Sequence, residues 1–140
     1  MRKNKLHIAL TLIAPLLLMA HSLHAEVINI SKAELQTLLD EGTAIVDVRR
    51  LDEWNDTGII KDSHMLTFFD AKGGYDAGKW LGDLEEVVAS SDPVILICRS
   101  GGRTRMVSQW LSEKQGYARV YNVTSGILDW MQKGGETVAP

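Results

Sequence analysis

Short apolar runs alternate with helical patterns along most of the chain. The runs rich in β-branched side chains predict buried strands at Val27–Ile30, Ala44–Val48, Val94–Ile97 and Ala118–Val123, with a weaker strand at His64–Thr67. Because strands alternate with helical segments, we expect an α/β fold built on a parallel sheet of about five strands with helices on both faces.

The helical segments carry start and stop signals. Ser31 and Glu34 form a capping box at the start of a helix that Gly42 ends, and Asp76 is the expected cap of another helix. The spacing of apolar residues predicts three more helices, over Leu51–Asn55, Arg103–Lys114 and Ile127–Met131.

Cys98 is the only cysteine and follows the run Val94–Ile97 directly. It opens a loop with two glycines and two arginines, Arg99-Ser100-Gly101-Gly102-Arg103-Thr104, and a helix comes next. Loop amides, a helix N-terminus and guanidinium groups together stabilise an anion, which predicts a reactive thiolate. The alternative is a packed, inert cysteine. A packing role for Cys98 would not explain two glycines and two arginines in the loop, so we favour a nucleophilic role for this cysteine.

Asp47, Arg49 and Glu53 lie at the carboxyl end of the second predicted strand. Ligands of parallel α/β sheets bind beyond such ends, so these residues should meet the Cys98 loop at one edge. We expect Asp47 to accept hydrogen bonds from loop amides or to pair with an arginine. For Arg49 we prefer an ion pair with Glu53, four residues on, to binding an anionic substrate. The Phe68-Phe69 pair and Tyr75 are a candidate apolar wall beside the sulfur.

Residues 1–25 have the pattern of a signal peptide. Arg2, Lys3 and Lys5 precede an apolar run from Leu6 to Ala20, which is shorter than the roughly 20 residues that span a bilayer. We expect cleavage after Ala25, with Ser22 as the second choice, and export to the bacterial periplasm. An uncleaved anchor is the alternative.

Removal of the leader makes the chain more acidic. The leader holds three of the 15 basic residues and none of the 18 acidic residues. Residues 26–140 therefore keep 12 basic and 18 acidic residues. Such a charge balance argues against nucleic acid or an anionic membrane as a partner. These residues suffice for one domain with one core, and one cysteine allows no internal disulfide.

The segment Ile97–Thr104 resembles the active-site loop of the rhodanese (sulfurtransferase) family. Two further segments are similar to family signatures: Ile45–Arg49 with Glu53-Trp54 and Gly58–Ile60, and Val120–Val123 with Ser125-Gly126 and Trp130. The resemblance covers about residues 27–138 and implies a rhodanese-like three-layer fold. Four positions depart from the pattern: Ile59 stands for a histidine, Asp62-Ser63 for Gly-Ala, and Ser125 for the first glycine of a pair.

The resemblance implies a reaction and a division of roles. Cys98 would be the catalytic residue, residues Arg99, Ser100, Gly101, Gly102, Arg103 and Thr104 would bind substrate, and Asp47, Arg49 and Glu53 would support them. The donor would be a small sulfur anion such as thiosulfate, and the acceptor cyanide, a thiol or a partner protein, with no metal or organic cofactor.

The same residues are compatible with other functions. The spacing is Cys-x4-Arg, one residue shorter than the Cys-x5-Arg loop of cysteine phosphatases, so a phosphatase or arsenate reductase is the less favoured alternative. A persulfide-carrying or redox-sensing module would use the same residues as a sulfurtransferase. A binding domain with an idle loop is disfavoured by the intact cysteine.

Overall fold

The computed structural model describes residues 25–140, and the predicted signal peptide lies outside this range apart from Ala25. Five strands form one parallel sheet: β1 (Glu26–Ile30), β2 (Ala44–Asp47), β3 (His64–Met65), β4 (Val94–Ile97) and β5 (Arg119–Val123). The strand order is β1-β5-β4-β2-β3, which puts β4 at the centre. The predicted parallel sheet is confirmed, although β3 is two residues long and ends before Leu66.

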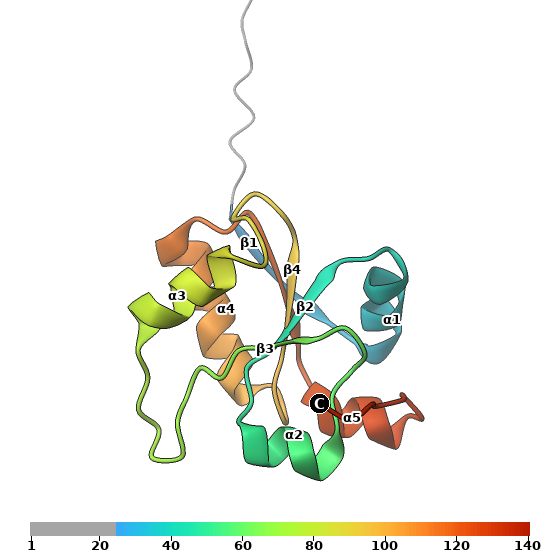
Figure 1. Cartoon of the computed structure of the whole chain (residues 1–140). Coiled ribbons are helices and arrows are strands. Elements are labelled where there is room, and N and C mark those ends of the chain that lie inside the picture. The colour runs from blue at the N-terminus through green and yellow to red at the C-terminus, as the bar shows by residue number, and fades with distance from the viewer. Residues whose placement is uncertain (1–24) are drawn as a thin grey trace, which may run out of the picture.

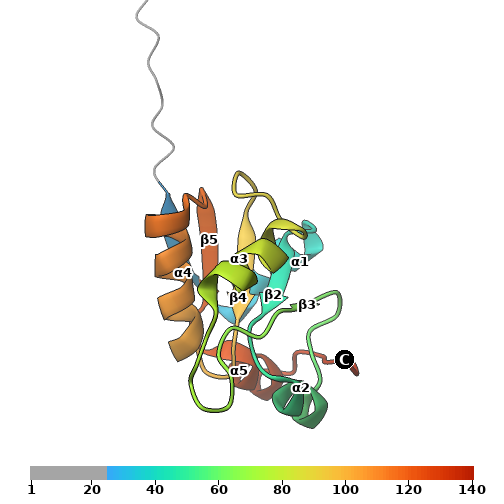
Figure 2. The same ribbon diagram turned by 60° about the vertical axis from the view of Figure 1, so that its left-hand side comes forward.

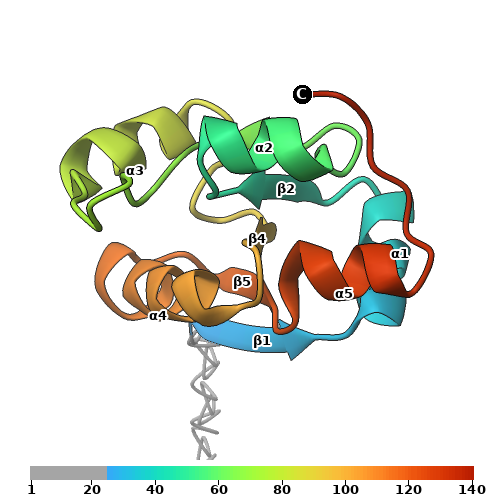
Figure 3. The same cartoon turned by 90° about the horizontal axis from the view of Figure 1, so that it is seen from below.

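The described residues also form five helices around the sheet: α1 (Lys32–Asp40), α2 (Leu51–Thr57), α3 (Ala77–Glu85), α4 (Gly102–Gln115) and α5 (Gly126–Gln132). Figure 3 shows α3 and α4 on one side of the sheet and α1 and α5 on the other. The two resulting cores contain Trp80, Leu84, Val107 and Leu111 on the first side, and Leu35, Ile127 and Trp130 on the second. None of the described helices is long and apolar enough to span a membrane.

The predicted caps are present. The Ser31 hydroxyl accepts from the Glu34 amide, and the Glu34 carboxylate accepts from the Ser31 amide at 2.7 Å, which completes the capping box of α1. Asp76 accepts from the Lys79 amide at 2.9 Å at the start of α3. Each cap satisfies amides that the first turn of a helix leaves without a partner.

The strands end together at one edge of the sheet, the lower edge in Figure 1, where α2 and the beginnings of α4 and α5 also lie. Strand register fixes this arrangement, because Asp47 of β2 pairs with Ile97 of β4 and Val48 donates from its amide to the Ile97 carbonyl oxygen at 3.0 Å. Val48 and Cys98 are thus neighbours just beyond the two central strands.

The residues that depart from the family pattern fit the backbone conformation at their positions. Ile59 is buried and exchanges two backbone hydrogen bonds with Val138, of 2.9 and 2.8 Å. Asp62 has a φ of 65°, a conformation that aspartate tolerates better than most residues. Ser125 has a φ of −107°, whereas Gly126 has a φ of 63°, so the second residue of this pair is the one that requires glycine.

Beyond β2, the chain buries an ion pair completely. Arg49 donates from Nη2 to Asp47 Oδ2 at 2.7 Å and from Nε to Asp47 Oδ1 at 2.9 Å, and neither residue is exposed. The same guanidinium donates to the Gly58 carbonyl oxygen at 2.9 Å and to the Thr57 hydroxyl at 2.7 Å. One buried side chain therefore ties the end of β2 to the end of α2.

We predict that Arg49→Met lowers the free energy of unfolding by about 3–5 kcal/mol, because it keeps much of the volume but leaves the buried Asp47 charge without its partner. Arg50→Met is the matched control, since Arg50 pairs at the surface with Asp52. Urea unfolding of both variants measures the difference. Equal stabilities for the two variants would contradict the role given to Arg49.

Candidate active site

Cys98 lies at the carboxyl end of β4, and its side chain is 1% exposed. The Gly101 amide donates to Cys98 Sγ at 3.1 Å, and the Thr104 hydroxyl oxygen lies 3.5 Å from the same sulfur. The Thr104 hydroxyl also donates to the Gly101 carbonyl oxygen at 3.2 Å. The loop therefore curls around the sulfur, with one amide already directed at it.

The helix that follows adds further donors. α4 begins at Gly102, and the first N–H groups of a helix have no carbonyl partner within the helix. Gly101 has a φ of 94°, and a Cβ there would lie 1.8 Å from the Thr124 carbonyl oxygen. Glycine at this position is required both by the backbone angle and by the close approach of the β5–α5 connection.

The start of α5 holds the other side of the loop. The Ile127 amide donates to the Cys98 carbonyl oxygen at 2.9 Å, and the Leu128 amide donates to the Arg99 carbonyl oxygen at 3.2 Å. A Cβ at Gly126 would lie 2.3 Å from the Arg99 carbonyl oxygen. We did not single out Gly126 as a site residue from the sequence, although the glycine of the Ser125-Gly126 pair was the available signal.

Arg103 closes the loop and is fixed by Glu53 of α2. Its Nη1 and Nη2 donate to the two carboxylate oxygens of Glu53 at 2.8 and 2.6 Å. This contact lowers the pKa of the Glu53 carboxyl and raises the pKa of the Arg103 guanidinium. A two-bond pair of this geometry is strong and directional, so it positions the end of the loop on α2.

The predicted ion pair of Arg49 with Glu53 is wrong. Arg49 pairs with Asp47, and it touches Glu53 only through a 3.3 Å hydrogen bond to the backbone carbonyl oxygen. The spacing rule for such pairs assumes that both residues lie on one helix, but α2 begins at Leu51, beyond Arg49. The prediction that Asp47 pairs with an arginine is confirmed.

Arg99 and Ser100 are exposed at the outer side of the loop. Arg99 lines a hollow of about 420 Å³ together with residues of α2 and the chain before it. Within residues 25–140 the other arginines of this hollow are paired with carboxylates, whereas Arg99 has no ion-pair partner. Arg99 is thus the arginine of this hollow that has no carboxylate partner among the described residues, and the hollow is also lined by Asp56, for which no ion pair is found there either.

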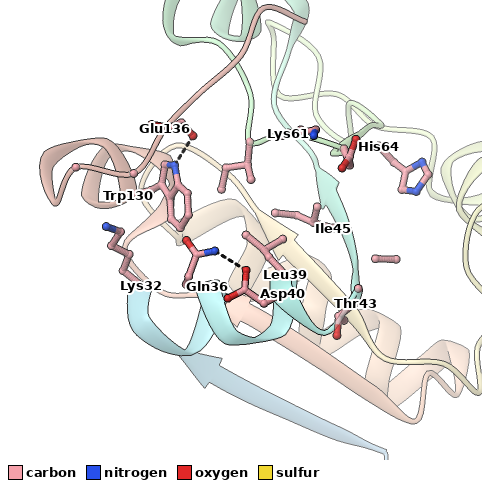
Figure 4. Close-up of a pocket in the computed structure, with 16 residues that line it drawn as sticks. Lys32, Gln36, Leu39, Asp40, Thr43, Ile45, Lys61, His64, Trp130 and Glu136 are labelled. Atoms are coloured by element: carbon pink, nitrogen blue, oxygen red, sulfur yellow. Dashed lines mark hydrogen bonds between the residues drawn. The ribbon is translucent and has the colours of Figure 1, made fainter.

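The structure brings the predicted residues together at one edge but leaves a larger pocket elsewhere. That pocket, of about 700 Å³, lies between α1, β2 and the segment after α5, and Figure 4 shows Gln36, His64 and Trp130 among its lining residues. It contains side chains of both charges and none of the predicted site residues. No cluster of three or more metal-binding side chains occurs in the described part of the chain.

Comparison with protein families and solved structures identifies the family of this fold. The family model described as "Rhodanese-like domain" matches residues 31–133. The chain belongs to this family. A rhodanese-like domain protein from Staphylococcus aureus superposes with a TM-score of 0.59 at 24% identity, over 79% of this chain and 98% of that one, which supports the fold.

Two curated relatives carry functional names. "Thiosulfate sulfurtransferase 18" of Arabidopsis thaliana is 27% identical over 76% of this chain and 79% of its own length. A "Sulfurtransferase" of Allochromatium vinosum is 43% identical over 34% of this chain and 43% of its own length. The names of both relatives refer to sulfur transfer. The chain spans only 44% of the length of a Bacillus subtilis relative and 18% of the length of a second relative from Arabidopsis thaliana.

The Glu53–Arg103 pair predicts a pH-dependent stability. Because Glu53 has a lowered pKa in the folded protein, its contribution is complete above the unfolded pKa of about 4.3 and is lost as the pH falls through the lower folded value. Glu53→Gln should therefore cost about 1 kcal/mol of unfolding free energy at pH 7 and progressively less below about pH 4.

Urea unfolding of Glu53→Gln and the parent protein at pH 7 and below about pH 4 tests this dependence. Asp56→Asn serves as the matched control, because Asp56 is an exposed carboxylate on the same helix. A cost of Glu53→Gln that stays the same at low pH would contradict the ion-pair explanation.

Proposed function

We propose that this rhodanese-like protein is a sulfurtransferase that moves a sulfane sulfur from an anionic donor such as thiosulfate, through a persulfide on Cys98, to a thiol or cyanide acceptor. The observation that carries the proposal is the 3.1 Å hydrogen bond from the Gly101 amide to Cys98 Sγ, inside a Cys-x4-Arg loop at the end of the central strand. An amide aimed at sulfur stabilises negative charge on it.

The first step forms the persulfide. The Cys98 thiolate attacks the outer sulfur of thiosulfate, the S–S bond of the donor breaks, and sulfite leaves with the electron pair. Arg99, which is exposed beside the loop and has no ion-pair partner among the described residues, binds the oxygens of the donor. The unpaired amides at the start of α4 face the negative charge of the outer persulfide sulfur.

The second step returns the enzyme to its starting state. A nucleophilic acceptor attacks the outer sulfur, the S–S bond of the persulfide breaks, and the Cys98 thiolate is released. Cyanide would give thiocyanate, and a thiol of a small molecule or a protein would give a new persulfide. The two steps balance without an oxidant, a metal or an organic cofactor.

Arg103 has a different role from that of Arg99 in this proposal. Because both of its terminal nitrogens donate to Glu53, it holds the loop rather than the donor. A persulfide-carrying module would share the first step and lack turnover with small acceptors, so turnover separates it from an enzyme.

Cys98→Ser should abolish sulfur transfer and keep the fold, because a hydroxyl occupies nearly the same space but forms no persulfide. The measurement is thiocyanate production from thiosulfate and cyanide, with circular dichroism as the control for folding. Mass spectrometry of the parent after thiosulfate should show one added sulfur on Cys98. Activity retained in a folded Cys98→Ser protein would refute the assignment of the nucleophile.

We further propose that the protein is exported and that its mature form begins at Glu26. The basic residues and apolar run before Ala20 support this proposal. Cell fractionation and N-terminal sequencing should find a periplasmic protein that starts at Glu26. Full-length protein in the cytosol would refute it.

A further inference from the structure

A hollow of about 420 Å³ lies beside α2 at the Cys98 edge of the sheet. Figure 2 shows α2 at the same edge as the end of β4 and the beginning of α4. This hollow, the Arg99 hollow, is lined by three arginines and three acidic residues: Arg49, Arg50, Arg99, Asp52, Glu53 and Asp56. What it can hold therefore depends on which of these charges already have a partner.

Four of these six charged residues belong to ion pairs. The contacts are Arg50 Nη2–Asp52 Oδ2 at 3.0 Å, Arg49 Nη2–Asp47 Oδ2 at 2.7 Å and Arg103 Nη2–Glu53 Oε1 at 2.6 Å. Among residues 25–140, Arg99 and Asp56 are in no ion pair. The Arg99 hollow therefore presents one positive and one negative charge that no neighbouring side chain neutralises.

Asp56 lies in the last turn of α2, four residues after Asp52 and therefore on the same face of the helix. The carbonyl groups at the C-terminus of a helix favour cations and disfavour carboxylates. No basic residue occurs in this turn of α2. Helix stability thus gives no reason for an acidic residue here, and the main effect of its charge is on the hollow that it lines.

The backbone that carries Asp56 is held in place. The hydroxyl of the next residue, Thr57, accepts from Arg49 Nη1 at 2.7 Å, and the Gly58 carbonyl oxygen accepts from Arg49 Nη2 at 2.9 Å. Arg49 is itself buried in its ion pair with Asp47. The end of α2 is therefore fixed, and the Asp56 carboxylate is a permanent part of the wall of the Arg99 hollow.

A donor anion that is bound by Arg99 shares the hollow with Asp56. The guanidinium attracts this anion and the carboxylate repels it. Because Coulomb energies are proportional to the charge of the ligand, Asp56 repels a dianion twice as strongly as a monoanion in the same place. The carboxylate therefore cancels part of the advantage that thiosulfate would otherwise gain from its second negative charge.

We propose that Asp56 is a specificity-determining residue that selects sulfur donors by charge, and that it disfavours dianions relative to donors with a single negative charge. The inference rests on the proposed sulfurtransferase function and specifies its donor class. The bonds that form and break at Cys98 are the same for both classes of donor. What differs is the electrostatic work of bringing the donor to Arg99 beside a fixed carboxylate.

The test compares thiosulfate with methanethiosulfonate, a monoanion that releases methanesulfinate in place of sulfite, in the parent protein and in Asp56→Asn, with cyanide as the acceptor. At low ionic strength we expect kcat/KM to rise about fourfold for thiosulfate and about twofold for methanethiosulfonate, mainly through KM. Asp56→Lys changes the charge twice as much, so rises of about sixteenfold and about fourfold should follow. At about 1 M salt, where the screening length is about 3 Å, these differences should largely disappear.

Glu113→Gln is the matched control, because it changes the net charge by the same amount as Asp56→Asn. Glu113 is also an exposed carboxylate in the last turn of a helix, and it has no ion-pair partner among the described residues. It lies roughly 16 Å along α4 from Gly102, at 1.5 Å per residue. The ratio of kcat/KM for thiosulfate to that for methanethiosulfonate in this variant should equal the ratio in the parent.

The outcomes are distinguishable. Thiosulfate turnover with an unchanged donor ratio in folded Asp56→Asn and Asp56→Lys overturns the role of Asp56 and leaves the sulfurtransferase proposal intact. A change that is equal for both donors, or that persists at about 1 M salt, also overturns this role, because charge repulsion depends on donor charge and on screening. Absence of thiocyanate from both donors overturns both proposals. Circular dichroism checks the folding of each variant.

Discussion

The site depends on the buried ion pair between Asp47 and Arg49. A charge pair removed from water is retained only when every donor and acceptor is used, and here the spare nitrogens of Arg49 bind the Thr57 hydroxyl and the Gly58 carbonyl oxygen. These contacts fix α2 against the end of β2. α2 in turn presents Glu53 to Arg103, so a chain of polar contacts leads from the sheet to the end of the Cys98 loop.

The charges around the sulfur are therefore used mostly for geometry. Arg49 and Arg103 are each bound to a carboxylate. What is left for an anion is the Gly101 amide, the start of α4 and the exposed Arg99. Fixed dipoles of this kind act without reorganisation during a reaction, so the proposed chemistry depends on a rigid loop.

Local signals in the sequence predicted most of the fold. The apolar run before Cys98, the glycines after it and the cap at Ser31 each specify a local conformation, and each is found as expected. The partners of the charged residues were not predictable in this way. Glu53 and Arg103 are 50 positions apart, and only the strand order brings them together. The sequence predicts that Phe68, Phe69 and Tyr75 gather into an apolar wall, and their rings pack together, but no local signal indicates that Trp110 of α4 joins them.

The same contacts explain why loop length matters in this site. Cys98 is fixed at one end by the register of β4, and Arg103 is fixed at the other by its two hydrogen bonds to Glu53. The number of residues between two fixed ends determines how far the amides stand from the sulfur. With four intervening residues, the Gly101 amide reaches Sγ itself. A longer loop between the same ends would move these amides outward and leave more space above the sulfur, so the position of Glu53 helps to set the size of that space.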